Sequence, residues 1–113
     1  MSGITTHVLD TSRGRPASGV PVVLEFREDD GWREIARAET DADGRVRQLL
    51  PPESPLVAGT WRLTFGVGTY FETQGVESFY PEASIVFAIR DPGQHHHVPL
   101  LLSPYGYSTY RGS

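Results

Sequence analysis

The length, composition and charge of the chain indicate one acidic domain and exclude several classes of site. The sequence has 113 residues, the size of a single domain with its own hydrophobic core, and we expect one domain over residues 1–113. Its 10 Lys and Arg against 14 Asp and Glu residues give a formal net charge of −4, which argues against a nucleic-acid-binding surface. The absence of cysteine excludes disulfides and thiolate chemistry. Neither a signal peptide nor an apolar run of membrane-spanning length is visible, so we expect a cytoplasmic protein that acts away from membranes.

Apolar and polar residues alternate through the first half of the chain, between frequent glycines and prolines. Alternation with a period of two is typical of half-buried β-strands. The strands predicted in this half cover residues 4–9, 20–27, 32–39 and 45–49. Two Asp-Gly pairs, Asp30-Gly31 and Asp43-Gly44, are typical of tight turns because these residues tolerate positive φ. We expect the first pair to join its flanking strands into an antiparallel hairpin.

The second half of the chain continues the pattern of short strands and turns. The strands predicted here cover residues 61–67, 83–90, 95–102 and 107–110. One short helix is expected at residues 70–75. About eight short strands separated by turns indicate an all-β fold, an antiparallel two-sheet β-sandwich, with an open barrel as the alternative.

The four histidines are suited to proton transfer, because imidazole titrates near neutral pH. His7 lies in the first predicted strand, and the other three are consecutive at the start of the penultimate strand. The face of that strand with His96 is the more apolar and should point inward, so His95 and His97 are expected to face outward. An outward face that carries histidines and Leu101 suggests a surface covered by a partner subunit.

The residues alone leave the chemistry of this region open. The spacing of His95 and His97 suits a metal ion, but no Asp, Glu or Cys flanks the pair as a third ligand, so we predict no metal site. Arg45 and Arg47 point to one face after the Asp43-Gly44 turn, and the pattern does not rank them. The last four residues, Tyr-Arg-Gly-Ser at 110–113, are dense in polar chemistry, so we expect the tail to be folded into a site.

Three segments carry a resemblance that narrows this interpretation. They are Thr6–Asp10 followed by Gly14–Ala17, the turn Thr40–Arg45, and the C-terminal stretch His95–Ser113. Together they resemble the motifs of the 5-hydroxyisourate hydrolases, the transthyretin-related enzymes of urate breakdown. The Tyr-Arg-Gly-Ser ending separates these enzymes from the transthyretin hormone carriers, which share the fold. The resemblance covers the whole chain.

The resemblance implies a fold, a reaction and an assembly. The fold is a transthyretin-like sandwich, assembled as a homotetramer with active sites in a channel between dimers. The reaction is hydrolysis of the cyclic amide of 5-hydroxyisourate to 2-oxo-4-hydroxy-4-carboxy-5-ureidoimidazoline, on the route from urate to allantoin, without a cofactor. The main rival is a non-catalytic carrier of the transthyretin type, and an immunoglobulin-like adhesion module is disfavoured by the lack of an export signal.

Matching the motifs residue by residue assigns roles within this sequence. The catalytic set that the resemblance implies is His7, Arg45, His97 and Ser113. The substrate-binding set is His7, Arg45, Tyr110 and Arg111. A histidine would activate water, with His7 and His97 left as alternatives for the base, and Arg45 would stabilise the oxyanion. His96 departs from the family pattern, which more usually has an aromatic residue between the two histidines.

Overall fold

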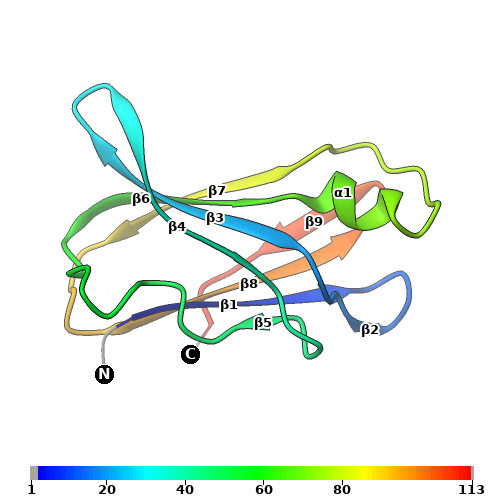
Figure 1. The fold of residues 1–113 in the computed structure, drawn as a ribbon, viewed down its shortest axis with the longest axis horizontal. Helices are drawn as coiled ribbons and strands as arrows, with labels where there is room; N and C mark the ends of the chain where they lie inside the picture. The colour runs from blue at the N-terminus through cyan, green and yellow to red at the C-terminus, as the bar shows by residue number, and fades with distance from the viewer. Residues whose placement is uncertain (1–2, 113) are drawn as a thin grey trace.

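The computed structural model describes residues 3–112 and has two β-sheets and one short helix (Figure 1). In chain order the elements are β1 (Gly3–Asp10), β2 (Arg15–Pro16), β3 (Pro21–Glu28), β4 (Gly31–Glu39), β5 (Arg45–Val46), β6 (Gly59–Phe65), α1 (Val67–Glu72), β7 (Ala83–Ile89), β8 (His95–Ser103) and β9 (Gly106–Thr109). One sheet has the order β2-β1-β8-β9, with β5 also paired to β1, and the other has the order β4-β3-β6-β7. The sheets form two layers with α1 at one end, which confirms the predicted sandwich rather than the open barrel.

The strands pair antiparallel with one exception. β1 and β8 run parallel, with Thr5 opposite His97 and His7 opposite Pro99, and this one pairing departs from the predicted antiparallel sandwich. Parallel neighbours cannot be joined by a tight turn and need a long connection. Here the whole of the second sheet lies between β1 and β8 in the sequence. This pairing places the start of β1 beside the start of β8.

Some element boundaries differ from those predicted from the sequence. β5 has two residues instead of the five expected at 45–49, and the two-residue strand β2 was not expected. The positive φ of the β3–β4 turn falls on Asp29, at 52°, and not on the following Asp-Gly pair. Gly44 has a φ of 74°, as its turn requires, and a Cβ there would lie 2.4 Å from the Val8 carbonyl oxygen. Only glycine therefore fits beside β1 at this position.

The helix begins earlier than expected, at Val67 instead of residue 70. Directly after β6, the Gly66 N–H donates to the Pro21 carbonyl at the start of β3 at 2.8 Å. The Gly66 carbonyl then accepts from the Tyr70 N–H at 3.2 Å and opens the helix. The helix has six residues, so the described part of the chain has no helix long enough to cross a membrane.

The core lies between the two sheets and follows the predicted alternation. Its largest fully buried side chains include Trp61, Phe65, Phe71, Leu24, Leu63 and Leu100. In β8 the face with His96 and Leu100 is buried, whereas His95 is exposed and His97 is half-buried, as the sequence predicted. The inward positions supply the hydrophobic stabilisation, so the outward positions of β1 and β8 are free to carry polar chemistry.

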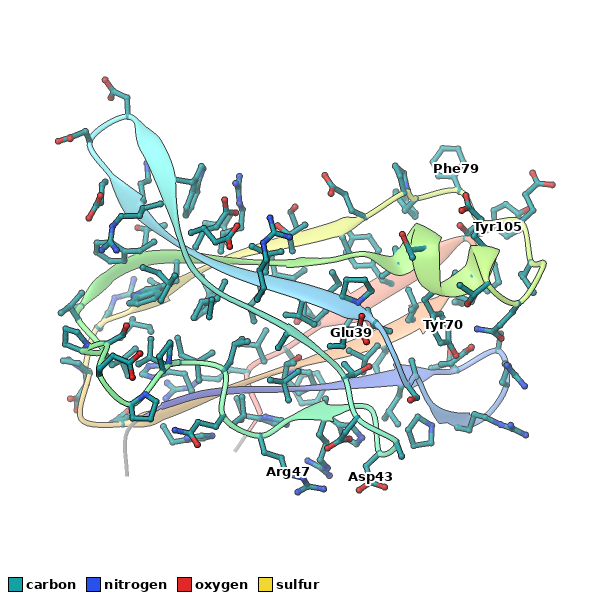
Figure 2. All side chains as sticks on the ribbon, viewed as in Figure 1. Glu39, Asp43, Arg47, Tyr70, Phe79 and Tyr105 are labelled. Atoms are coloured by element: carbon teal, nitrogen blue, oxygen red, sulfur yellow. The ribbon has the colours of Figure 1, made fainter. Side chains whose placement is uncertain are left out.

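A buried carboxylate joins the end of β1 to α1. Asp10 is fully buried, and its Oδ1 accepts hydrogen bonds from the backbone and side chain of Ser12 and from the Arg13 N–H. Its Oδ2 accepts from the Tyr70 hydroxyl at 2.8 Å, and Figure 2 shows Tyr70 reaching from α1 toward the sheet below it. Burial, followed by this hydrogen bond, raises the pKa of Tyr70.

We expect Tyr70→Phe to lower the free energy of unfolding by about 1–3 kcal/mol, because it removes a donor from a buried carboxylate. Tyr105→Phe is the matched control, since Tyr105 is 65 % exposed. Urea unfolding of both variants measures the difference. Equal stabilities for the two variants would contradict the structural role of the Asp10–Tyr70 hydrogen bond.

Candidate active site

Three strands bring together side chains that lie far apart in the sequence. In the antiparallel pair of β1 and β5, His7 lies opposite Arg45. In the parallel pair of β1 and β8, Thr5 lies opposite His97. His7, Arg45 and His97 are all partly exposed on the outer side of this sheet. β1 therefore forms the middle of a polar cluster that β5 and β8 complete.

A hollow of about 320 Å³ lies on this outer face. It is lined by Thr5, Thr6, Arg45, Val46, Arg47, His95 and His97. Arg45 and Arg47 differ in their partners. Arg47 Nη2 lies 3.0 Å from Asp43 Oδ2, its Nε lies 3.5 Å from Asp41 Oδ2, and Figure 2 shows Arg47 and Asp43 outside the sandwich. Within residues 3–112 the Arg45 guanidinium has no such partner, so its donors are available to a ligand.

His97 is held from two sides. The Thr5 hydroxyl lies 2.8 Å from His97 Nδ1, and the Gly112 N–H donates to the His97 carbonyl at 2.9 Å. A Cβ at Gly112 would lie 2.5 Å from His97 Cδ2. The glycine of the C-terminal segment thus lets the backbone pass directly over the imidazole, and the tail forms a wall beside it.

The electrostatic surroundings keep both histidines of the cluster neutral. Burial is the largest cause that lowers the pKa of His97 below its ordinary value of 6.5, followed by the charge of Arg45 and by His7. Burial and then Arg45 also lower the pKa of His7, and this outweighs the opposite effect of Asp41 and Asp43. A neutral imidazole has a free lone pair, so at neutral pH each histidine can accept a proton.

Comparison with known proteins shows the family to which the whole chain belongs. The model of the HIUase/Transthyretin family, where HIUase stands for 5-hydroxyisourate hydrolase, matches residues 4–112. The chain belongs to the HIUase/Transthyretin family. Among its curated relatives, the 5-hydroxyisourate hydrolase of Salmonella dublin is 47% identical over 110 residues, which cover 97% of this chain and 80% of the relative.

The solved structures to which the chain is similar include a 5-hydroxyisourate hydrolase and a transthyretin. The structure of Klebsiella pneumoniae 5-hydroxyisourate hydrolase has a TM-score of 0.86 and 41% identity, and the match covers 99% of this chain and 100% of that one. Sea bream transthyretin in complex with thyroxine has a TM-score of 0.88 and 32% identity, with 96% and 93% covered. These likenesses confirm the transthyretin-like fold that the resemblance implied.

The C-terminal residues implied by the family motif lie in different places. Tyr110 and Arg111 do not line the hollow that contains Arg45. They line a second cavity of about 280 Å³, beside β7 and His96. Arg111 Nη2 donates to Gln94 Oε1 at 3.0 Å and to the His95 carbonyl at 3.4 Å, which ties the tail to the start of β8. Ser113 lies outside the described residues.

His96, the departure from the HIUase/Transthyretin pattern, lies on the inner face of β8 and away from the hollow. It is 5% exposed, and its Nδ1 has no hydrogen-bond partner within residues 3–112. Burial, followed by the charge of Arg111, lowers its pKa, so it is held as a neutral core residue. In that same range, no group of three or more His, Cys, Asp or Glu side chains is arranged to hold a metal ion.

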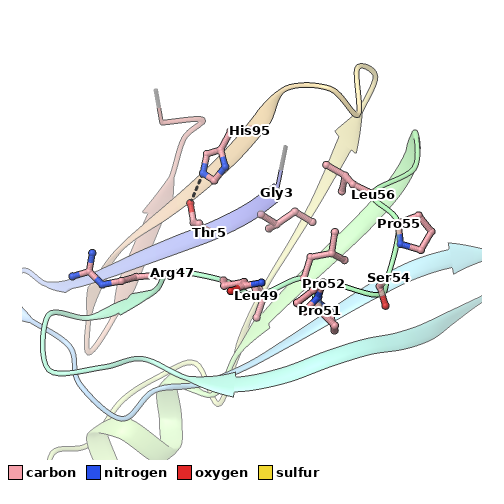
Figure 3. Close-up of a pocket in the computed structure, with 13 residues that line it drawn as sticks. Gly3, Thr5, Arg47, Leu49, Pro51, Pro52, Ser54, Pro55, Leu56 and His95 are labelled. Carbon is pink, nitrogen blue, oxygen red and sulfur yellow. Dashed lines mark hydrogen bonds between the residues drawn. The ribbon is translucent and has the colours of Figure 1, made fainter. Parts of the chain in front are cut away.

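Sequence reasoning missed two neighbours of the cluster. The alternation of residues 4–9 places Thr5 on the same face of β1 as His7. The contact of Thr5 with β8, however, depends on the parallel register. A further cavity of about 440 Å³ shares Thr5, Arg47 and His95 with the hollow and extends under the proline-rich loop at residues 51–56. Figure 3 shows this cavity, with the Thr5–His95 hydrogen bond on one side and Pro51, Pro52 and Pro55 on the other.

Proposed function

We propose that the chain is a 5-hydroxyisourate hydrolase. It opens the six-membered ring of its substrate at the cyclic amide and yields 2-oxo-4-hydroxy-4-carboxy-5-ureidoimidazoline, on the route from urate to allantoin. The observation that carries this proposal is the outward cluster of His7 and His97, whose pKa values are both lowered, beside an Arg45 guanidinium that has no ion pair within residues 3–112. The names of the Salmonella and Klebsiella relatives support it. A carrier would need a mainly apolar and neutral lining, which this cluster does not provide.

The proposed reaction uses water as the nucleophile. One of the pair His7 and His97 takes a proton from water, and the water oxygen attacks the amide carbonyl carbon. The carbonyl oxygen becomes an oxyanion, which Arg45 stabilises through its planar array of N–H donors. The carbon–nitrogen bond of the ring then breaks, and the histidine returns its proton to the leaving nitrogen. The two histidines titrate as a pair, so the base is assigned to the pair and not to one ring.

The pH dependence of the reaction follows from the direction of the two pKa shifts. Both histidines have pKa values below 6.5 in the folded protein, so kcat/KM should stay level near neutral pH and fall only as the pH drops below that value. Initial rates measured from about pH 8 down to about pH 5, the range in which histidine titrates, test this. If kcat/KM has already fallen to its low-pH value near neutral pH, a neutral histidine base is contradicted.

The C-terminal residues complete the proposal. Ser113 follows Gly112, whose backbone passes over the His97 ring, so its hydroxyl or carboxylate would orient a histidine or hold the substrate. Tyr110 and Arg111 bind the substrate from the same segment. Their cavity also includes His97, and this shared residue supports their role.

The assembly, location and extent of the protein are also proposed. The hollow lies on the outer side of a sheet, and a reaction that must control water needs such a site to be covered. We infer that a homotetramer covers the hollow at a dimer–dimer interface. Light scattering should give a mass of about four times the 12.5 kDa of the chain, and the mass of a monomer would contradict the inference. Three further properties stay predictions: a single domain over residues 1–113, a cytoplasmic location and a cofactor-free reaction.

The proposed activity is tested with far less protein than substrate. Freshly generated 5-hydroxyisourate decays spontaneously, and its absorbance reports the decay. A hydrolase at a small fraction of the substrate concentration should accelerate the loss of all of the substrate. A carrier would at most protect a stoichiometric fraction, and decay at the spontaneous rate would contradict the proposal.

A further inference from the structure

Thr5 bridges two histidines of the cluster. Its Oγ1 lies 2.8 Å from His97 Nδ1 and 2.8 Å from His95 Nε2. The parallel register of β1 and β8 creates this geometry, because it places Thr5 opposite His97 and Gly3 opposite His95, on the same outward face. One hydroxyl therefore connects the half-buried imidazole of His97 to the exposed imidazole of His95.

The positions of the protons in this chain of hydrogen bonds are constrained. A threonine hydroxyl has one proton, so when both rings are neutral it donates to one of them and accepts from the other. In one arrangement His97 Nδ1–H donates to Thr5, the Thr5 hydroxyl donates to His95 Nε2, and the Nε2 of His97 is left with a free lone pair. In the opposite arrangement the Nε2 of His97 carries the proton and cannot act as a base. The direction of two hydrogen bonds thus decides whether His97 can take a proton from water.

We propose that Thr5 is a positioning residue that holds His97 in its basic tautomer, and that Thr5 and His95 relay the proton that His97 takes up. When His97 Nε2 gains a proton, its Nδ1–H bond breaks as a new Thr5 O–H bond forms. The original Thr5 O–H bond breaks as a His95 Nε2–H bond forms. The positive charge ends on His95, and the reverse shift returns it when the leaving nitrogen needs a proton.

Cations lie near both ends of this hydrogen-bond chain. Arg45 from β5 and His7 from β1 oppose a positive charge on His97, and Arg47 also lines the hollow, although Asp41 and Asp43 pair with it. Arg111 from the tail donates to the His95 carbonyl at 3.4 Å. In the single chain His95 is more exposed than His97, so its ring keeps more contact with water. The more exposed end of the hydrogen-bond chain therefore offers the proton more water than the half-buried ring of His97 does.

The relay rests on the proposed hydrolase function, with His97 as the member of the histidine pair that takes the proton. It is tested with two substitutions at one position. Thr5→Val keeps the branched shape and removes the hydroxyl, and Thr5→Ser keeps the hydroxyl. We expect Thr5→Val to lower kcat by roughly 10–100-fold with little change in KM, part of the usual contribution of acid–base catalysis, and to change the acid limb of the pH–rate profile. Thr5→Ser should stay within a few-fold of the wild type. Equal losses in both variants, or wild-type kinetics in both, would overturn the relay.

A second readout does not depend on turnover. Nitrogen-15 NMR of the histidine rings distinguishes the two tautomers, and it should show His97 protonated at Nδ1 in the wild type. Thr5→Val should remove this preference, and a wild-type His97 protonated at Nε2, or the same tautomer in both proteins, would overturn the proposal. If the wild type fails to hydrolyse 5-hydroxyisourate, the proposed function is wrong, and the NMR result still decides the hydrogen-bond chain.

Discussion

Replacing Arg45 with alanine should lower kcat/KM for 5-hydroxyisourate by about 10²–10³-fold, the usual cost of losing one oxyanion donor. The guanidinium makes no ion pair within residues 3–112, so its removal should leave the sandwich intact. The substitution therefore removes the proposed oxyanion donor without disturbing the fold. Initial rates, together with circular dichroism to confirm folding, measure the effect.

Arg47→Ala is the matched control for this prediction. Arg47 lies two residues away on the same side of the chain, but its guanidinium is engaged by Asp41 and Asp43 at exposed positions. Exposed ion pairs contribute little to stability, so this variant should stay folded and lose far less activity than Arg45→Ala. Near-normal turnover in Arg45→Ala would remove that residue from the site, and a larger loss in Arg47→Ala would exchange the two roles.

Deleting Tyr110–Ser113 should abolish hydrolysis and leave the sandwich folded. β9 ends at Thr109, and the buried core is formed by residues before this segment. The deletion removes the Gly112 N–H that holds the His97 carbonyl and the Arg111 contacts with the start of β8. Retained turnover in a folded truncated protein would refute the role of the tail.

A single substitution refines the test of the tail. Gly112→Ala places a methyl group 2.5 Å from His97 Cδ2, so the ring or the tail must move. A displacement of about 1 Å can cost about 10²-fold in rate, and we expect a loss of this order. Gly106→Ala is the control, because a Cβ there meets only Ser103 Oγ at 3.7 Å. Similar rates for the two variants would show that the contact with His97 does not matter.

Most of the fold could be predicted from the sequence, because its strands are half-buried and alternate cleanly. The inward set in β8 and the outward placement of His95 and His97 follow from a period of two alone. The parallel pairing of β1 with β8 could not be predicted, because register between strands some 90 residues apart depends on packing of the whole sandwich. The start of α1 was missed because Val67 continues the alternation of β6, and only the Gly66–Pro21 hydrogen bond shows where the sheet ends.

The candidate site could be predicted only in part, for the same reason. His7, Arg45 and His97 were assigned by resemblance, and strand pairing explains why residues so distant in sequence meet. The choice between Arg45 and Arg47 depends on which guanidinium is already paired, and side-chain ion pairs follow from the three-dimensional turn. The bridging role of Thr5 needs the parallel register, so alternation placed it on the correct face without showing its partners.

The central claim is that Arg45 and His97 act as one hydrolytic unit, and a double-mutant cycle tests it most directly. The measurement is kcat/KM for 5-hydroxyisourate in the wild type, Arg45→Ala, His97→Gln and the double variant. Residues that act together in one transition state give strongly non-additive losses. We predict that the double variant is little slower than the slower single variant. Losses that multiply, or single variants with wild-type rates, would contradict the account.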